Sequence, residues 1–261
     1  MDRSVDRSGS GDRSVDGGSP RFRLFCLPYA GGSASVYHRW PNLFPGDIEV
    51  RAVELPGRGH RMAEPPFLRM APLVRALATS LEPLLDRPYA IFGHSMGGLI
   101  GFELVRALRA RGKPMPAHLF VSAIAPPGTQ PDLRPLSQAP DSEVLDELRR
   151  LNGTPRELLD NEELMALMLP VVRADFSVLE AYEYSPAAPL PVPITAFGGT
   201  ADRVVAASAL GGWRRQSAVS SRLHIFTGDH FFVNSAVTEV VQEITSTLEI
   251  SIHTERLGAS L

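Results

Sequence analysis

Cysteine and lysine are almost absent from this chain of 261 residues, which contains one of each, Cys26 and Lys113. A single cysteine excludes an internal disulfide. Because Cys26 lies in an apolar, strand-like run, we expect a small buried side chain rather than a nucleophile. Long apolar runs are also missing: no segment approaches the roughly 18 residues that a membrane span needs, and the N-terminus lacks the apolar core of a secretion signal. We therefore expect a cytoplasmic protein with no membrane contact.

The net charge of −3 gives no excess of positive charge of the kind that nucleic-acid binding requires. With 44% hydrophobic residues, the chain can bury a substantial core. Residues 1–20 contain mainly Ser, Gly, Asp and Arg and cannot contribute to that core, so they read as a disordered leader. We expect one folded domain over residues 21–250, followed by a C-terminal tail over residues 251–261.

Short apolar runs alternate with longer helical patterns from Phe22 onward. This alternation predicts an α/β fold, with a mostly parallel sheet and helices on both faces. Pro72 suits the first turn of a helix, whereas Pro83 should end or kink the same helix. The predicted strands are 22–27, 48–53, 89–93, 118–124, 192–197 and 222–227, and the predicted helices are 71–86, 96–111, 204–216 and 236–249.

A long insertion interrupts this rhythm before the strand predicted at 192–197. It contains two helical patterns, 141–151 and 155–184, and Pro170 should split the second of them. An insertion at this point would hang over the carboxyl ends of the strands, so we expect a helical lid over about residues 130–188. Apolar residues recur through it at helical spacing. They would either pack onto the main domain or line a substrate channel.

The most informative motif is Gly93-His94-Ser95-Met96-Gly97, which follows one apolar run and opens a helical pattern. This Gly-x-Ser-x-Gly elbow places a serine hydroxyl on a strained strand-to-helix turn. A β-carbon at Gly93 or Gly97 would collide across the tight turn. The helix that follows points its N-terminal amides toward a bound carbonyl group. We expect Ser95 to be a nucleophile.

A serine nucleophile needs a base and a third group that orients the base. In this class of fold, the chain order is serine, acid, histidine. Of seven histidines, only His230 follows the last predicted strand in a glycine-bounded loop, so it is the predicted base. His94 adjoins Ser95, but the turn should send neighbouring side chains apart.

Asp202 is the predicted acid because it follows strand 192–197 through Gly198-Gly199-Thr200-Ala201 and so reaches the carboxyl edge of the sheet. Asp229 is adjacent to His230, a geometry that rarely lets a carboxylate reach the far ring nitrogen. Asp175 lies in the insertion, where a solvated helix charge is the simpler interpretation. No carboxylate ends the strand at 118–124, which disfavours an acid from that strand.

Two backbone amides should stabilise the oxyanion that forms during acyl transfer. One is the N–H of Met96, directly after the nucleophile. The other should come from the loop after strand 22–27, which reads Pro28-Tyr29-Ala30-Gly31-Gly32-Ser33, and Ala30 is the predicted donor. A plain glycine-rich turn is the alternative interpretation of this loop.

Taken together, five motifs resemble the type II thioesterases that accompany polyketide and nonribosomal peptide synthases. The likeness covers about residues 21–250. Two departures stand out: Tyr29 replaces the usual Phe or His, and 122–127 lacks arginines often found there in the family. The motifs are Leu27-Pro28-Tyr29-Ala30-Gly31-Gly32, Leu55-Pro56-Gly57-Arg58-Gly59, Gly93-His94-Ser95-Met96-Gly97, Gly198-Gly199-x-x-Asp202 and Gly228-Asp229-His230-Phe231-Phe232.

The resemblance implies an α/β-hydrolase fold and hydrolysis of acyl groups from the phosphopantetheine arm of acyl or peptidyl carrier proteins. Such enzymes clear carriers that are blocked by aberrant acyl chains. The resemblance implies no metal and no cofactor, since the substrate itself carries the phosphopantetheine. We expect a monomer. Candidate residues for a substrate channel are Tyr29, Met165, Met168, Phe176 and Phe231.

Carrier proteins are usually acidic, so a basic rim near the active site would assist docking. Arg58, Arg61 and Arg203 are candidates for this rim by their proximity to the motifs, with ordinary solvated arginines as the alternative. Three other functions remain open from sequence: a general carboxylesterase with the same triad, an acyltransferase that uses an alcohol or amine instead of water, and a non-catalytic module that binds carrier proteins.

Overall fold

The computed structural model describes residues 20–129 and 135–258, with side chains up to residue 249. The expected leader lies outside the described residues except for Pro20. The described part of the chain forms one six-stranded sheet. Its strands are β1 (Phe22–Leu27), β2 (Ile48–Ala52), β3 (Tyr89–His94), β4 (His118–Ser122), β5 (Ile194–Gly199) and β6 (Ser221–Phe226).

All neighbouring strands of the sheet pair in parallel, in the order β2-β1-β3-β4-β5-β6. This confirms the predicted fold class and, to within a few residues, all six predicted strands. The chain moves from β1 to the edge strand β2, returns to β3 on the other side of β1, and then proceeds outward to β6. Successive strands are therefore added on one side of β1 up to β2 and on its other side from β3 onward. At such a change in strand order, between β1 and β3, the carboxyl ends of parallel strands form a crevice suited to ligands.

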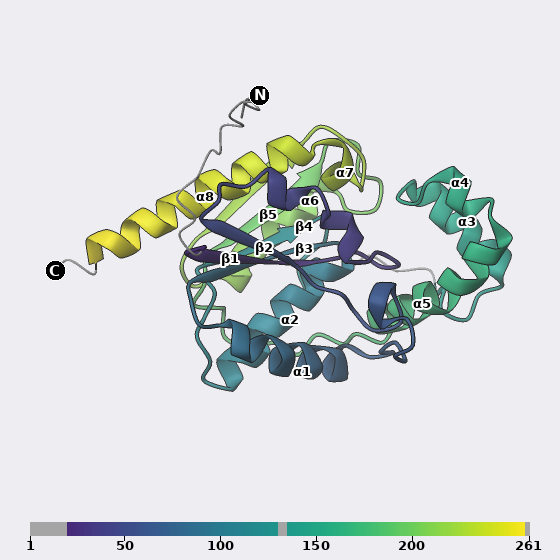
Figure 1. The fold of residues 1–261 in the computed structure, drawn as a ribbon, viewed down its shortest axis with the longest axis horizontal. Coiled ribbons are helices and arrows are strands. Elements are labelled where there is room, and N and C mark those ends of the chain that lie inside the picture. The colour runs from purple at the N-terminus through teal and green to yellow at the C-terminus, as the bar shows by residue number, and fades with distance from the viewer. Residues whose placement is uncertain (1–19, 130–134, 259–261) are drawn as a thin grey trace, which may run out of the picture.

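Helices cover both faces of the sheet (Figure 1). Side chains alternate between the faces along each strand: Phe22, Leu24 and Cys26 belong to one hydrophobic cluster, whereas Phe25 and Leu27 belong to the other. Cys26 is fully buried, as expected from its apolar surroundings. The helices are α1 (Met70–Leu81), α2 (Met96–Ala110), α3 (Asp141–Leu151), α4 (Arg156–Leu159), α5 (Glu162–Glu180), α6 (Ala207–Leu210), α7 (Phe232–Ser235) and α8 (Val237–Gly258).

Helices α1 and α2 pack on the cluster that contains Phe25, and α7 and α8 pack on the opposite cluster. In α1, Leu73, Val74 and Leu77 recur at helical spacing and are buried. The helix ends at Leu81 and continues as a 3-10 turn over Glu82–Leu84, which places the stop at Pro83 as predicted.

Two helices differ from the sequence expectation near the C-terminal half. Residues 204–216 were expected to form one helix, but they form the short α6 followed by a 3-10 helix over Gly211–Gln216. The glycine pair at 211–212 explains the change, since glycine is a poor former of helix interiors. Helix α8 begins at Val237, one residue after the expected start, and its backbone runs past the expected end at 249 to Gly258, so the described part of the expected C-terminal tail continues this helix.

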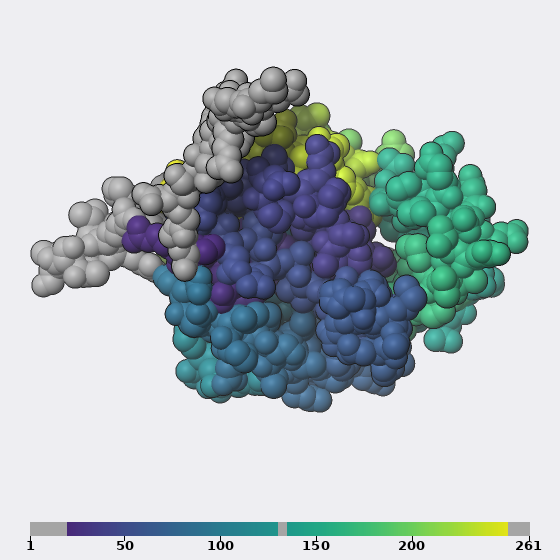
Figure 2. Space-filling model, in the orientation of Figure 1, coloured from purple at the N-terminus to yellow at the C-terminus, as the bar shows by residue number. Residues whose placement is uncertain are grey.

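The insertion between β4 and β5 carries α3, α4 and α5, and it forms a lobe at one edge of the molecule (Figure 2). Helix α3 matches the predicted pattern at 141–151. The predicted pattern at 155–184 is divided, but before Glu162 rather than at Pro170. Asn161 caps α5 by accepting a hydrogen bond from the N–H of Leu164.

Pro170 lies inside α5 and does not split it, which corrects the sequence expectation. Proline deprives the carbonyl four residues earlier, here that of Ala166, of its helical partner. Pro170 and Ala166 are both exposed, so water can satisfy that carbonyl. Buried residues on the other side of the helix, including Met165, Leu169 and Val172, hold the two halves together through one hydrophobic cluster.

No helix within the described ranges is long and apolar enough to cross a membrane.

Candidate active site

Ser95 occupies the sharp turn between β3 and α2, with φ 51° and ψ −119°. This backbone conformation is uncommon for a residue with a side chain and is typical of a nucleophile elbow. A β-carbon at Gly93 would collide with the carbonyl of Gly97, and one at Gly97 would collide with the carbonyl of Leu27. Both glycines of the motif are therefore required by close backbone approach, as the sequence predicted.

The structure brings Ser95, His230 and Asp202 into one hydrogen-bonded chain. The Ser95 Oγ lies 3.1 Å from Nε2 of His230, and Nδ1 of His230 lies 2.9 Å from Oδ2 of Asp202. These residues follow β3, β6 and β5, so all three stand at the carboxyl edge of the sheet. Both distances are within the range at which a base can take a proton and be oriented by a third group.

The carboxylate of Asp202 is fully buried and is held from two sides. Its Oδ1 accepts hydrogen bonds from the backbone N–H groups of Val204 and Val205 at 2.8 and 3.0 Å, which leaves Oδ2 for His230. Burial acts to raise the pKa of Asp202, but the interactions with His230 and with the two amides outweigh it, so the pKa lies below its ordinary value. Asp202 is therefore a carboxylate at neutral pH.

Both ring nitrogens of His94 have hydrogen-bond partners other than Ser95, which agrees with the expectation that the elbow sends the two side chains apart. Its Nδ1 lies 2.9 Å from Oγ of Ser122, and its Nε2 lies 2.9 Å from the backbone carbonyl oxygen of His230. Sequence reasoning missed this link, because both partners lie far from His94 along the chain. No local pattern indicates the contact.

The two predicted oxyanion donors come from the start of α2 and from the loop after β1, two segments that approach each other closely at Gly97. Met96 is the first residue of α2, and Ala30 lies in the loop after β1 and lines the same cavity as Ser95. Among the described residues, neither of these N–H groups has a hydrogen-bond acceptor. Both amides can therefore donate to an oxygen bound beside Ser95.

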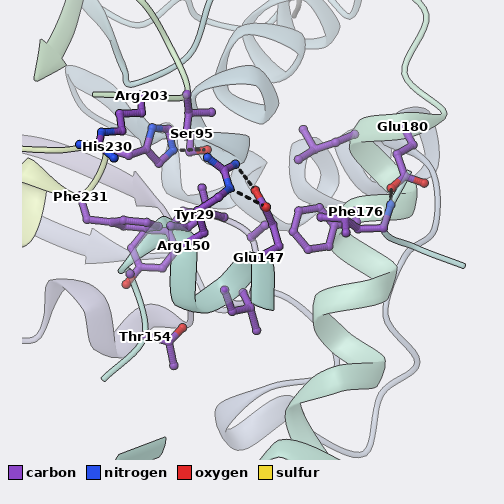
Figure 3. Close-up of a pocket in the computed structure, with 17 residues that line it drawn as sticks. Tyr29, Ser95, Glu147, Arg150, Thr154, Phe176, Glu180, Arg203, His230 and Phe231 are labelled. Carbon is purple, nitrogen blue, oxygen red and sulfur yellow. Dashed lines mark hydrogen bonds and ion pairs between the residues drawn. The ribbon is translucent and has the colours of Figure 1, made fainter. Parts of the chain in front are cut away.

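A cavity of about 490 Å³ opens onto Ser95 and His230 (Figure 3). Tyr29, Phe231 and Ala30 line it from the loops at the sheet edge. The insertion supplies much of the rest, including an ion pair between Glu147 and Arg150. Apolar side chains of the insertion at this cavity are Leu136, Leu148, Leu151, Phe176 and Leu179.

Three of the five candidate channel residues, Tyr29, Phe176 and Phe231, lie at this cavity. Met165 and Met168 do not, which corrects the expectation for them. Met165 is buried among apolar residues of α3, α4 and α5, and Met168 packs against the same cluster. The burial of Met165 fits the alternative of a packing face, whereas Met168 packs against the same cluster and also lines a separate, smaller cavity beside Gly31 and Arg58. Helical spacing alone could not separate the two roles, because one helix presents residues to both.

Arg58 and Asp175 also differ from the sequence expectation. Arg58 was a candidate for an exposed basic rim, and Asp175 was interpreted as a solvated charge. Their side chains are instead only 7% and 4% exposed, and they form a bidentate ion pair. Of the other rim candidates, Arg61 is paired with Glu64, whereas Arg203 is exposed and lines the cavity.

Within residues 20–129 and 135–249, no cluster of three or more His, Cys, Asp or Glu side chains is arranged to hold a metal ion. The chemistry available at the site is that of a serine hydroxyl, an imidazole, a carboxylate and two backbone amides.

Comparisons with known proteins agree with this geometry. The family model described as a thioesterase domain matches residues 22–248. The chain is 41% identical over 230 residues to the gramicidin S biosynthesis protein GrsT of Aneurinibacillus migulanus, which covers 88% of this chain and 90% of that protein.

Solved structures give the same result. ClbQ from the colibactin pathway superposes with a TM-score of 0.85 at 35% identity, covering 90% of this chain and 99% of that one. YbtT, a type II thioesterase from the yersiniabactin pathway, gives a TM-score of 0.80 at 31% identity, covering 90% of this chain and 95% of that one. The α/β-hydrolase fold expected from the sequence is confirmed, and the chain belongs to the thioesterase family.

Proposed function

We propose that this protein hydrolyses acyl groups from the phosphopantetheine arm of carrier proteins and so clears aberrant or stalled chains. Ser95 is the nucleophile, His230 is the general base, and Asp202 orients and stabilises the imidazole. The N–H groups of Ala30 and Met96 stabilise the oxyanion. The observation that carries this proposal is the continuous chain from Ser95 Oγ to His230 Nε2, 3.1 Å, and from His230 Nδ1 to Asp202, 2.9 Å.

In the acylation step, Nε2 of His230 takes the hydroxyl proton of Ser95 as Oγ attacks the thioester carbonyl carbon. The carbonyl oxygen becomes an oxyanion that accepts hydrogen bonds from Ala30 and Met96. The C–S bond then breaks, and the sulfur leaves with the electron pair and takes the proton from His230. Thiols ionise near pH 8.5, so this leaving group needs little assistance from an acid.

In the deacylation step, His230 takes a proton from water, whose oxygen attacks the acyl carbon bound to Ser95. The oxyanion forms again in the same place. The C–O bond to Oγ breaks, the proton on His230 returns to Oγ, and the free carboxylic acid leaves. Asp202 stays ionised throughout and stabilises the imidazolium that exists in both steps, consistent with its lowered pKa.

The carrier-bound substrate is supported by the relatives and by the cavity. GrsT is a gramicidin S biosynthesis protein, and YbtT is a type II thioesterase from a mixed nonribosomal peptide and polyketide pathway. In this chain, the cavity beside Ser95 has apolar walls from the insertion, which suits an acyl chain. We propose that the insertion acts as a lid and that the exposed Arg203 belongs to a basic rim facing an acidic carrier protein.

The experiment that tests this function compares hydrolysis rates for three substrates with the same acyl group. These are the acyl-loaded carrier protein, the acyl N-acetylcysteamine thioester and the p-nitrophenyl ester. A kcat/KM at least tenfold higher for the loaded carrier supports the proposal. Ser95→Ala is the control, and we expect it to lose roughly 10³-fold or more of the activity while remaining folded.

Other outcomes identify the alternatives. Faster cleavage of the oxygen ester than of both thioesters would make the protein a general carboxylesterase. Acyl transfer to an added alcohol or amine in preference to water would make it an acyltransferase. Carrier binding without turnover of any substrate would make it a non-catalytic binding module.

A further inference from the structure

Arg58 and Asp175 form a buried ion pair that joins three parts of the molecule. Arg58 follows β2 in the Leu-Pro-Gly-Arg-Gly motif, and Asp175 lies on α5 of the insertion. The guanidinium donates to both carboxylate oxygens at 2.8 Å and also to the backbone carbonyl of Gly32 at 2.9 Å. Oδ2 of Asp175 accepts a further hydrogen bond from the N–H of Gly31 at 2.8 Å.

The backbone atoms that this pair contacts belong to the loop that carries Ala30. Residues Tyr29 to Gly32 form a β-turn, closed by a 2.9 Å hydrogen bond from the N–H of Gly32 to the carbonyl of Tyr29. Gly31 has φ 74° at the third position, where type II turns require a positive value. The ion pair fixes one peptide group within the turn, through the Gly31 N–H, and one at its end, through the Gly32 carbonyl.

The orientation of the Ala30 N–H follows from these constraints. Peptide groups are planar and trans, so the carbonyl of Tyr29 and the N–H of Ala30 point in opposite directions from one plane. The carbonyl points into the turn, toward Gly32, and the N–H therefore points out of it. Any rotation of the turn that released Gly31 or Gly32 from the ion pair would also move this N–H.

Close packing leaves the loop little freedom to choose another position. A β-carbon at Gly31 would lie 3.0 Å from Cγ2 of Val172, so the loop rests directly on α5. Phe176, adjacent to Asp175, lines the cavity beside Ser95. The same part of α5 thus packs against the loop that carries the oxyanion donor and lines the cavity where an acyl group would lie. Figure 3 shows Phe176 at this cavity.

We propose that the Arg58–Asp175 ion pair holds the Ala30 N–H in the position where it can donate to the oxyanion. Arg58 and Asp175 are thus positioning residues for the reaction. A displaced donor weakens binding of the oxyanion but leaves the ground-state thioester almost unaffected. The pair should therefore act on kcat rather than on KM. This inference rests on the proposed role of Ala30 in catalysis.

Two variants test the inference. Asp175→Asn keeps the shape of the side chain but sets an amide N–H₂ group against a donor of Arg58 in either orientation, and against the Gly31 N–H as well if it replaces Oδ2. Arg58→Met removes the guanidinium and keeps an unbranched apolar stem that reaches about as far as Nε of the arginine. The matched control is Arg23→Met, since Arg23 is buried to a similar degree and is paired with Glu49 and Asp86, but lies at the amino end of β1.

For both test variants we expect kcat to fall by roughly 10- to 100-fold, with KM within about threefold of the original, given that losing one oxyanion donor costs about 10²- to 10³-fold. The affinity for a trifluoromethyl ketone, which adds to the serine and places an oxyanion in the same position, should fall by the same factor as kcat/KM. Arg23→Met should lower the thermal midpoint, while kcat per folded molecule stays unchanged.

Wild-type kcat and ketone affinity in a folded Asp175→Asn variant would overturn the inference, as would equal effects on kcat from Arg23→Met. The nearly isosteric Asp175→Asn keeps the test informative if Arg58→Met does not fold. Ketone binding does not depend on the identity of the natural substrate. Failure of the wild-type protein to hydrolyse carrier thioesters would therefore overturn the proposed function while this inference is still tested by the inhibitor.

Discussion

The side chain of His94 holds the backbone of His230 in place, with its Nε2 2.9 Å from the His230 carbonyl oxygen. A carbonyl oxygen can only accept, so Nε2 carries the hydrogen and Nδ1 accepts one from the hydroxyl of Ser122. Burial, with a smaller contribution from His230, lowers the pKa of His94 to about 3, which keeps the ring neutral. The residue before the nucleophile thereby fixes the loop that presents the base.

Replacing His94 by Leu should reduce both stability and turnover. The variant leaves the buried His230 carbonyl and Ser122 hydroxyl without partners, at a cost of about 1–3 kcal/mol each. The loop of His230 also loses its tie to β3, so kcat should fall. Ser122→Ala is the comparison. In this variant His94 keeps its hydrogen bond to the His230 carbonyl, so the losses in unfolding free energy and in kcat should both be smaller. Urea unfolding and steady-state kinetics provide the values, and equal kcat in His94→Leu and wild type would contradict this role.

Asp202→Asn should lower kcat by roughly 10⁴-fold, as in other enzymes with a serine triad. The amides of Val204 and Val205 hold the side-chain oxygen, so the Asn N–H₂ group would face His230. Nδ1 must then accept, the hydrogen moves to Nε2, and the ring cannot take the proton of Ser95. Asp229→Asn is the matched control and should keep most activity, since the Asp229 carboxylate accepts from the Phe231 amide and from Asn152 rather than from His230. The reverse ranking would identify Asp229 as the acid.

Gly97→Ala should prevent the elbow from forming in its observed conformation. A β-carbon there would overlap the backbone carbonyl groups of Leu27 and Pro28, which cannot move without shifting β1. We expect the free energy of unfolding to fall by about 3 kcal/mol, the upper end of the usual cost of overpacking. Gly46→Ala is the control, because nothing lies within 4 Å of its β-carbon position. Circular dichroism during thermal unfolding measures both, and similar midpoints would contradict the steric argument.

The parts of the site that the sequence predicted are those encoded locally. Ser95 lies near the end of a strand in a Gly-x-Ser-x-Gly motif, and Asp202 and His230 each follow a strand within a few residues of a glycine. Chain order and the parallel sheet then require all three to meet at one edge. Each of these inferences needs only the residue and its neighbours, together with the fold class.

The parts that the sequence did not predict depend on contacts between distant segments. Arg58 and Asp175 are 117 positions apart, and nothing near either residue distinguishes a buried ion pair from two solvated charges. The sequence also could not predict that α5 continues through Pro170, because a proline is accepted in a helix when the carbonyl it leaves unpaired faces solvent. The roles of Met165 and Phe176 on one helix likewise depend on which surface approaches the sheet.

Stability should fall in mild acid partly because of His118. Burial, reinforced by Arg222, lowers its pKa from 6.5 to about 4 in the folded protein. Between these values the unfolded chain binds more protons, so the free energy of unfolding decreases as pH falls from about 6.5 to 4. The share of His118 is on the order of 3 kcal/mol.

Unfolding of His118→Gln at a series of pH values tests this, and its loss of stability over that range should be smaller than that of the wild type. Thr195→Val is the control: it removes the 2.8 Å hydrogen bond to His118 but leaves the ring buried, so it should keep the wild-type dependence on pH. If His118→Gln has the same slope as the wild type, the acid sensitivity arises elsewhere.

The most direct test of the central claim is to detect the acyl group on Ser95. The protein is mixed with an acyl-loaded carrier protein, quenched with acid within milliseconds to seconds, and analysed by intact and peptide mass spectrometry. We predict a transient mass increase equal to the acyl group, located on the peptide that contains Ser95 and absent from Ser95→Ala. Rapid hydrolysis with the acyl group found on another residue, or undiminished turnover by Ser95→Ala, would contradict the account.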